Sequence, residues 1–283
     1  MKQNLAWFKK LLLLAGVVFL GFAATLLAME NQIIFQPTQY PEGPWEQGQH
    51  DLEAEDVFFT TPDGLRLHGW WLPHPSARAT LIWYHGNAGN LSTRWRDLKT
   101  LKFLKVNLFI FDYRGYGKSE GAPDEAGLQT DSLAAYDFLV KEKHVSPERL
   151  FLLGRSLGGV FASWTASQRP AAGLIIESSL TSARDMAGVM YPYLPIAWAV
   201  QAKLDNLSTV SRLDLPKLFV HGTVDKVIPF AIGKRLFEAA APPKAFYPVE
   251  GADHFNLHET GAFAYFKVLD KFIGDHLPPT AAG

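Results

Sequence analysis

The sequence predicts an α/β fold in which helices cover both faces of a mostly parallel sheet, with one N-terminal transmembrane helix ahead of it. Two observations predict this arrangement. Residues 11–28 form an apolar run without a charge, and from residue 80 onward short apolar runs alternate with helix-compatible stretches. Strands and helices that alternate in this way usually build a parallel sheet that is buried on both faces.

The N-terminus is expected to be an uncleaved transmembrane signal anchor. A basic tail, residues 1–10, precedes the run 11–28, and about 18–20 apolar residues are enough to cross a bilayer. The lysines of the tail are Lys2, Lys9 and Lys10. A cleaved signal peptide and a buried helix are the alternatives. Signal-peptide apolar regions usually span only about 7–15 residues, however, and the sequence shows no clear small-residue cleavage site.

Charge and composition limit the possible partners. Because lysine-rich flanks stay in the cytoplasm, residues 29–283 are expected outside it, which in a bacterium means the periplasmic side of the inner membrane. The net charge of −1, without a further basic block, argues against nucleic acid. The absence of cysteine excludes disulfides, thiol catalysis and thiolate metal sites. With no metal-binding or phosphate-cradling pattern, no cofactor is expected.

Two features connect the anchor with the alternating region. The Pro-, Gly- and Gln-rich stretch 36–49 is expected to be a linker that crosses the domain surface. Runs 57–60 and 65–71 flank a Pro-Asp-Gly turn, and this pattern predicts a β-hairpin. The strands expected after it are 80–84, 106–111, 150–153, 173–176, 217–220 and 245–249. The helices expected are 93–104, 125–143, 157–168, 231–240 and 261–276.

One segment interrupts the alternation. Residues 178–215 contain no strand-like run, so we expect a short helical cap at about 180–213, above the carboxyl edge of the sheet. Its apolar side chains are candidates for a substrate pocket: Met186, Met190, Tyr191 and Trp198. The alternative is a helix that only packs on the core.

The segment Gly154-Arg155-Ser156-Leu157-Gly158 is the most informative motif. A strand-like run precedes it and a helix-compatible stretch follows, which is the context of a nucleophile elbow. Small residues two positions either side of the serine relieve crowding at so sharp a turn. The elbow would hold the Ser156 hydroxyl at the carboxyl edge of the sheet, beside the N-terminus of the next helix. The alternative is an ordinary strand-to-helix loop.

A serine nucleophile needs a base oriented by a carboxylate, and on this kind of sheet the chain order is Ser, acid, His. Asp225 and His254 follow the strands 217–220 and 245–249, so both are expected at the edge that holds Ser156. The competing residues are Glu177 as acid, Asp253 beside the base, and His85, His221 and His258. We expect Asp253 to order its loop, His85 and His221 to support turns, and His258 to open the last helix.

An oxyanion needs two donors. The N–H of Leu157, directly after the nucleophile, is one candidate. The loop His85-Gly86-Asn87 after the first central strand offers the other, the N–H of Asn87. A plain glycine turn is the alternative interpretation of this loop.

These motifs together resemble a known family. The segments 85–90, 112–121, 154–159 and 225–229 occur in the order found in the α/β-hydrolase-domain-containing protein 13 and 17 group and its bacterial relatives. The anchor and residues 31–37 are similar to the first of these. The resemblance covers about residues 30–275. It implies an α/β-hydrolase fold and a serine hydrolase with the triad Ser156, Asp225 and His254. The protein-17 subfamily removes palmitoyl groups from proteins and has a cysteine-rich N-terminus, whereas this chain has no cysteine.

The function expected from the sequence is hydrolysis of carboxylic esters or thioesters through an acyl-enzyme. The expected partners are a small-molecule or lipid-like acyl ester and, through the N-terminal helix, the membrane. A serine peptidase of the same fold is the first alternative, because the triad is shared. A membrane-bound interaction domain without catalysis is the alternative of a different class.

Overall fold

An eight-stranded sheet organises the computed structural model, which describes residues 2–193 and 197–279. The strands, in the spatial order β1-β2-β4-β3-β5-β6-β7-β8, confirm the predicted fold class. Their bounds are β1 (Glu55–Thr60), β2 (Arg66–Leu72), β3 (Thr80–Tyr84), β4 (Asn107–Phe111), β5 (Leu150–Arg155), β6 (Gly173–Glu177), β7 (Lys217–Gly222) and β8 (Lys244–Val249). β2 pairs antiparallel with β1 and β4, and the other pairs are parallel.

Helices cover both faces because side chains of a strand alternate between them. Ile82 and Tyr84 of β3 belong to the core under α5 (Glu125–Lys141), α6 (Leu157–Gln168) and α9 (Phe230–Ala239). Leu81 and Trp83 belong to the opposite core, under α4 (Trp95–Leu101) and α10 (Leu257–Asp275). Short 3₁₀ helices complete these elements: η1 (Leu91–Arg94), η2 (Lys102–Leu104) and η3 (Pro147–Arg149). α10 begins four residues earlier than expected and is kinked at Ala262, where φ is 42°.

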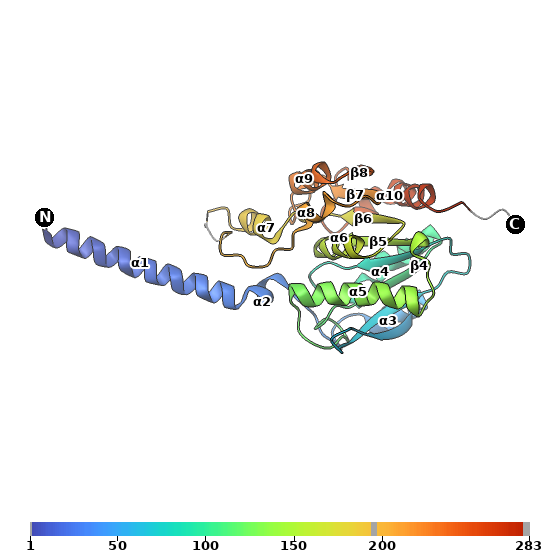
Figure 1. Cartoon of the computed structure of the whole chain (residues 1–283), viewed down its shortest axis with the longest axis horizontal. Coiled ribbons are helices and arrows are strands. Elements are labelled where there is room, and N and C mark those ends of the chain that lie inside the picture. Colours follow the sequence, from blue (N-terminus) through green and yellow to red (C-terminus); the bar gives the residue numbers. More distant parts are fainter. Residues whose placement is uncertain (1, 194–196, 280–283) are drawn as a thin grey trace.

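The N-terminal helix α1 (Lys2–Ala28) projects away from the domain, and the short α2 (Glu30–Ile34) follows it (Figure 1). Within the described residues, the segment Trp7–Thr25 is long and apolar enough to cross a membrane. Only 6% of it is buried, so its apolar surface is not used for packing against the domain.

The linker expected at residues 36–49 does cross the domain surface, but it is not free of secondary structure. Pro37 pairs with Gly89 and Gln39 with Gly117 in short parallel bridges, so the chain crosses the carboxyl edge of the sheet. A helix, α3 (Trp45–Leu52), then begins inside the stretch. Trp45 is 6% exposed and packs edge-to-face on Trp70, with ring centroids 5.9 Å apart. The burial of this tryptophan stabilises the segment against the core.

The segment between β6 and β7 contains two short helices, α7 (Ala183–Met190) and α8 (Asn206–Val210), and no strand among its described residues. The Ser182 side chain caps α7 by accepting the N–H of Asp185, and the Asp205 side chain caps α8 by accepting that of Ser208. α7 extends beyond the end of the sheet on the side from which α1 leaves the domain (Figure 1).

Candidate active site

Ser156 occupies a sharp turn between β5 and α6. Its φ of 56° and ψ of −123° lie outside the regions that non-glycine residues normally adopt. The turn is held because the Ser156 N–H donates to the Glu177 carbonyl at 2.8 Å, and its own carbonyl accepts the Ser179 hydroxyl at 2.7 Å. Backbone strain of this kind is common at functional sites. Ser156 itself is half-buried at the carboxyl end of the sheet.

The glycines of the elbow are required by close backbone approach. A Cβ on Gly158 would lie 1.9 Å from the carbonyl oxygen of Tyr84, and one on Gly154 would lie 2.5 Å from the carbonyl oxygen of Gly158. Both obstacles are main-chain atoms that cannot move as a flexible side chain does. The start of α6 therefore lies directly against the end of β3.

Gly158→Ala is expected to destabilise the protein by at least about 1–3 kcal/mol, the usual cost of overpacking a core. Gly188→Ala is the matched control, because Gly188 is a helical glycine with nothing within 4 Å of the added Cβ. The control should be neutral or slightly stabilising. Urea unfolding of both variants measures the difference. Equal midpoints for Gly158→Ala and the unsubstituted protein would contradict the close approach.

Asp225 and His254 form a buried pair. Asp225 lies in the turn after β7 and His254 in the loop after β8, and the two are 6% and 4% exposed. His254 Nδ1 lies 2.8 Å from Asp225 Oδ2. Since the carboxylate accepts, this contact fixes Nδ1 as the protonated nitrogen and leaves Nε2 to exchange a proton with another group.

The Asp225 carboxylate has further partners that the sequence analysis did not foresee. Oδ1 accepts the N–H groups of Val227 and Ile228 at 2.9 and 2.8 Å. His221, expected only to support a turn, has its Nε2 3.4 Å from Oδ2 and donates to the Ile228 carbonyl. Burial acts to raise the pKa of Asp225, but hydrogen bonds from His221 and His254 lower it more, so the pKa lies well below its ordinary value. The carboxylate is therefore ionised at neutral pH.

The three residues share the carboxyl edge of the sheet. Ser156 directly follows β5, and β6 separates that strand from β7 and β8, which carry Asp225 and His254. Among the described residues, the Ser156 hydroxyl has no hydrogen bond to the His254 ring. Catalytic hydrogen bonds are often long in free enzymes and shorten when substrate binds. The structure thus brings acid and base together and leaves the serine at the same edge, without a hydrogen bond to the base among the described residues.

The loop after β3 adjoins the serine. A Cβ on Gly86 would lie 3.3 Å from the Ser156 Cβ. The Asn87 side chain positions this loop, because its Oδ1 accepts the Gln36 N–H at 3.0 Å and the Tyr116 hydroxyl at 3.2 Å. Within residues 2–193 and 197–279, neither the Asn87 N–H nor the Leu157 N–H has a hydrogen-bond acceptor. Both donors therefore remain available near the serine.

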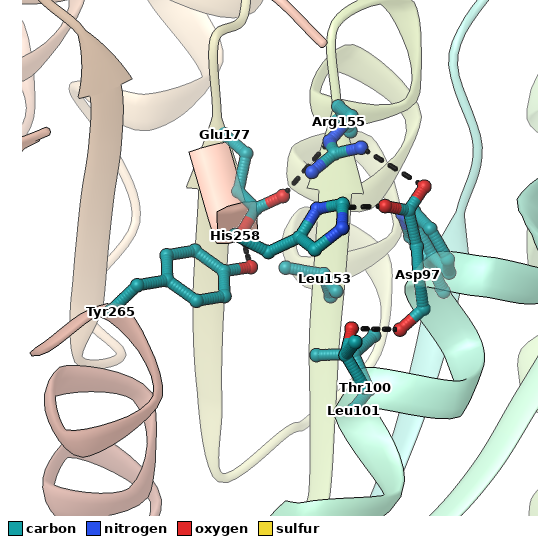
Figure 2. Close-up of a pocket in the computed structure, with 9 residues that line it drawn as sticks. Asp97, Thr100, Leu101, Leu153, Arg155, Glu177, His258 and Tyr265 are labelled. Atoms are coloured by element: carbon teal, nitrogen blue, oxygen red, sulfur yellow. Dashed lines mark hydrogen bonds and ion pairs between the residues drawn. The ribbon is translucent and has the colours of Figure 1, made fainter. Parts of the chain in front are cut away.

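Glu177, the competing acid, is occupied elsewhere. It is 1% exposed, its Oε2 accepts Arg155 Nε at 3.1 Å, and its Oε1 accepts the Tyr265 hydroxyl (Figure 2). Arg155 also donates to Asp97 at 3.2 Å, and Asp97 binds His258 at 2.8 Å. The cluster surrounds a cavity of about 10 Å³. It holds Glu177 in an ion pair with Arg155 and places the His258 ring against Asp97.

The two remaining competing residues, His85 and Asp253, have local partners. His85 Nδ1 lies 2.8 Å from the Gly86 carbonyl oxygen, which agrees with the expectation that His85 supports a turn. Asp253 Oδ1 accepts the N–H groups of Phe255 and Asn256 at 2.8 and 3.1 Å, and so orders its loop.

The four candidate pocket residues line neither the small cavity beside Glu177 nor the larger groove described below. Met186 is half-buried and packs against the core, but Met190, Tyr191 and Trp198 are 60%, 40% and 59% exposed. A groove of about 590 Å³ lies elsewhere, between the end of α6 and the residues before β7, and neither Ser156, Asp225 nor His254 lines it.

Comparison with known proteins agrees with this fold. The sequence profile of the family described as "Serine aminopeptidase, S33" matches residues 75–211. Protein YfhR of Salmonella typhimurium is 37% identical over 80% of this chain and 83% of its own. The α/β-hydrolase domain-containing protein WAV2 of Arabidopsis thaliana is 29% identical over 93% of each chain. An esterase of Pyrococcus furiosus superposes with a TM-score of 0.71 at 19% identity, over 87% of this chain and 99% of its own.

The chain belongs to the α/β-hydrolase superfamily. By family it is a hydrolase.

Proposed function

We propose that this hydrolase cleaves carboxylic esters or thioesters through an acyl-enzyme, with Ser156 as nucleophile, His254 as base and Asp225 as acid. The observation that carries the proposal is the 2.8 Å contact between His254 and an ionised, buried Asp225, at the sheet edge where a strained turn presents Ser156. A base held in one tautomer by a carboxylate, at the same sheet edge as a serine, is the set of groups that activates serine.

Each step follows from these groups. His254 Nε2 takes the Ser156 proton as Oγ attacks the acyl carbon, and the N–H groups of Leu157 and Asn87 stabilise the oxyanion. The imidazolium, stabilised by Asp225, returns the proton to the departing alkoxide or thiolate, which leaves Ser156 acylated. A water then attacks the acyl group, His254 removes its proton, and collapse of the second intermediate releases the carboxylic acid and restores Ser156.

Peptidase activity is the second candidate, because the matching family profile carries the description of a serine aminopeptidase. A panel of p-nitrophenyl esters of increasing chain length, assayed beside an aminoacyl p-nitroanilide, separates the candidates. We expect ester turnover, with the anilide cleaved much more slowly. Turnover of the anilide in preference to every ester would favour the peptidase, and turnover of neither would favour an interaction domain.

We further propose that α1 holds the protein in a membrane, with residues 1–10 in the cytoplasm and residues 29–283, including the cap at about 180–213, on the periplasmic side of a bacterial inner membrane. Its apolar surface and its three flanking lysines support this topology. In a bacterial host, alkaline phosphatase fused to the C-terminus should be active and green fluorescent protein dark. The opposite pattern, or release of the full-length protein by carbonate, would refute the anchor.

A further inference from the structure

The cap segment carries exposed apolar side chains close together in the chain. Their exposed fractions are 36% for Val189, 60% for Met190, 40% for Tyr191, 96% for Tyr193 and 59% for Trp198. We refer to these five side chains as the cap surface. Isolated exposed apolar residues are ordinary, but a concentration of this kind marks a contact with another apolar phase. Two of the five are tyrosines and one is a tryptophan, the residues enriched where membrane meets water.

Hydrogen bonds tie this segment to the base of α1. The Glu30 carboxylate, two residues after α1 ends, accepts the main-chain N–H groups of Gln201 and Ala202 at 2.9 and 3.0 Å. Three residues of extended chain span at most about 11 Å, so Trp198 lies within about that distance of Gln201, whose N–H donates to Glu30 just after the end of α1. The headgroup region on each side of a bilayer is about 5–8 Å thick. A bilayer that surrounds α1 therefore has one headgroup region at the end of α1 to which the cap segment is tied.

The same connection orients the candidate site. The chain that leaves α1 pairs with Gly89, in the loop after β3, and with Gly117, in the turn after β4. Both loops belong to the carboxyl edge of the sheet, where Ser156 lies. Figure 1 shows α1 and α7 leaving the domain on this one side. The edge that carries the catalytic candidates thus faces the membrane that would hold α1.

We propose that the cap surface lies in the headgroup region of the bilayer that holds α1, and that the site acts on acyl esters drawn from that bilayer. The inference rests on the proposed anchor and the proposed esterase activity. It gives the exposed side chains Met190, Tyr191 and Trp198 an apolar environment that the domain itself does not provide.

The absence of cysteine permits a direct test on the full-length chain. Tyr193→Cys and Trp198→Cys, each labelled with an environment-sensitive nitrobenzoxadiazole dye, are reconstituted in phosphatidylcholine vesicles that contain acyl-brominated lipid. Leu13→Cys, in the exposed apolar face of α1, reports insertion. Phe103→Cys is the matched control, because Phe103 is 77% exposed but precedes β4, at the opposite edge of the sheet.

We expect bromolipid to quench the dye at positions 13, 193 and 198 and to leave position 103 unaffected. Quenching at position 13 alone would overturn the contact of the cap while retaining the anchor. No quenching at position 13 would overturn the anchor and, with it, the inference. Equal quenching at positions 103 and 193 would show unspecific adsorption and overturn the inference as well.

Activity tests the substrate class. Tyr193→Glu should reduce hydrolysis of a long-chain ester dissolved in the vesicles by about tenfold, equivalent to about 1.4 kcal/mol. Hydrolysis of a water-soluble acetyl ester by the same sample should be unchanged, which keeps this result separate from failure of the esterase proposal. Phe103→Glu should change neither rate. An unaltered ratio of the two rates in Tyr193→Glu would overturn the proposed source of the substrate.

Discussion

Ser156→Ala is expected to abolish ester turnover, with a loss on the order of 10⁴–10⁶ in kcat, as found when a triad nucleophile is removed. The fold should survive the change, because the contacts that hold the turn are made by the Ser156 main chain and not by its hydroxyl. Its N–H donates to Glu177, and its carbonyl accepts the Ser179 hydroxyl. Alanine keeps both.

Ser163→Ala provides the control for this variant. Ser163 is buried in the middle of α6, and its hydroxyl donates to the Gly159 carbonyl within the helix. Loss of that bond should affect stability by at most about 1 kcal/mol and leave turnover in place. Purified, folded Ser156→Ala that retained more than about a tenth of the esterase rate would exclude Ser156 as nucleophile.

Asp225→Asn should lower kcat by about 10⁴, the cost of the equivalent change in a related triad. An amide in place of the carboxylate removes the negative charge that stabilises the imidazolium. It also presents an N–H group where His254 Nδ1 must donate, which favours the wrong tautomer.

Glu177→Gln is the matched comparison, since it makes the same chemical change at the competing acid. Glu177 contacts Arg155 and Tyr265, so its loss should destabilise the buried ion cluster (Figure 2). Turnover per folded molecule should remain. An inactive Glu177→Gln protein beside an active Asp225→Asn protein would reverse the assignment.

The central strands of the sheet could be predicted because their apolar composition reflects their burial on both faces. Leu81 to Tyr84 in β3, like Phe151 to Leu153 in β5, are apolar throughout, which is typical of strands covered on both faces. The elbow was visible because the glycines on either side of Ser156 are required by contacts of the turn itself. The approach of Asp225 to His254 followed from their positions after neighbouring parallel strands.

The parts that the sequence analysis missed depend on tertiary contacts. α3 was not predicted because it lies in a polar stretch and only Trp45, Gly48 and Leu52 are buried. Their spacing of three and four residues is helical, but the Gln and Pro residues around them favoured the prediction of a linker. The contact of His221 with Asp225 depends on the path of the turn after β7. The role of Met190 and Trp198 in a substrate pocket stays a prediction; their exposure could not be foreseen, because apolar character alone does not say whether a side chain is buried.

Covalent labelling by a fluorophosphonate, followed by peptide mass spectrometry, tests the central claim most directly. The reagent phosphonylates the activated serine of a working triad, with loss of fluoride, so we expect one adduct, on Ser156, formed in step with loss of esterase activity. Labelling should be strongly slowed in Asp225→Asn and absent in Ser156→Ala. An esterase that stays active while Ser156 remains unlabelled, or an inactivating adduct on a different serine, would contradict the account.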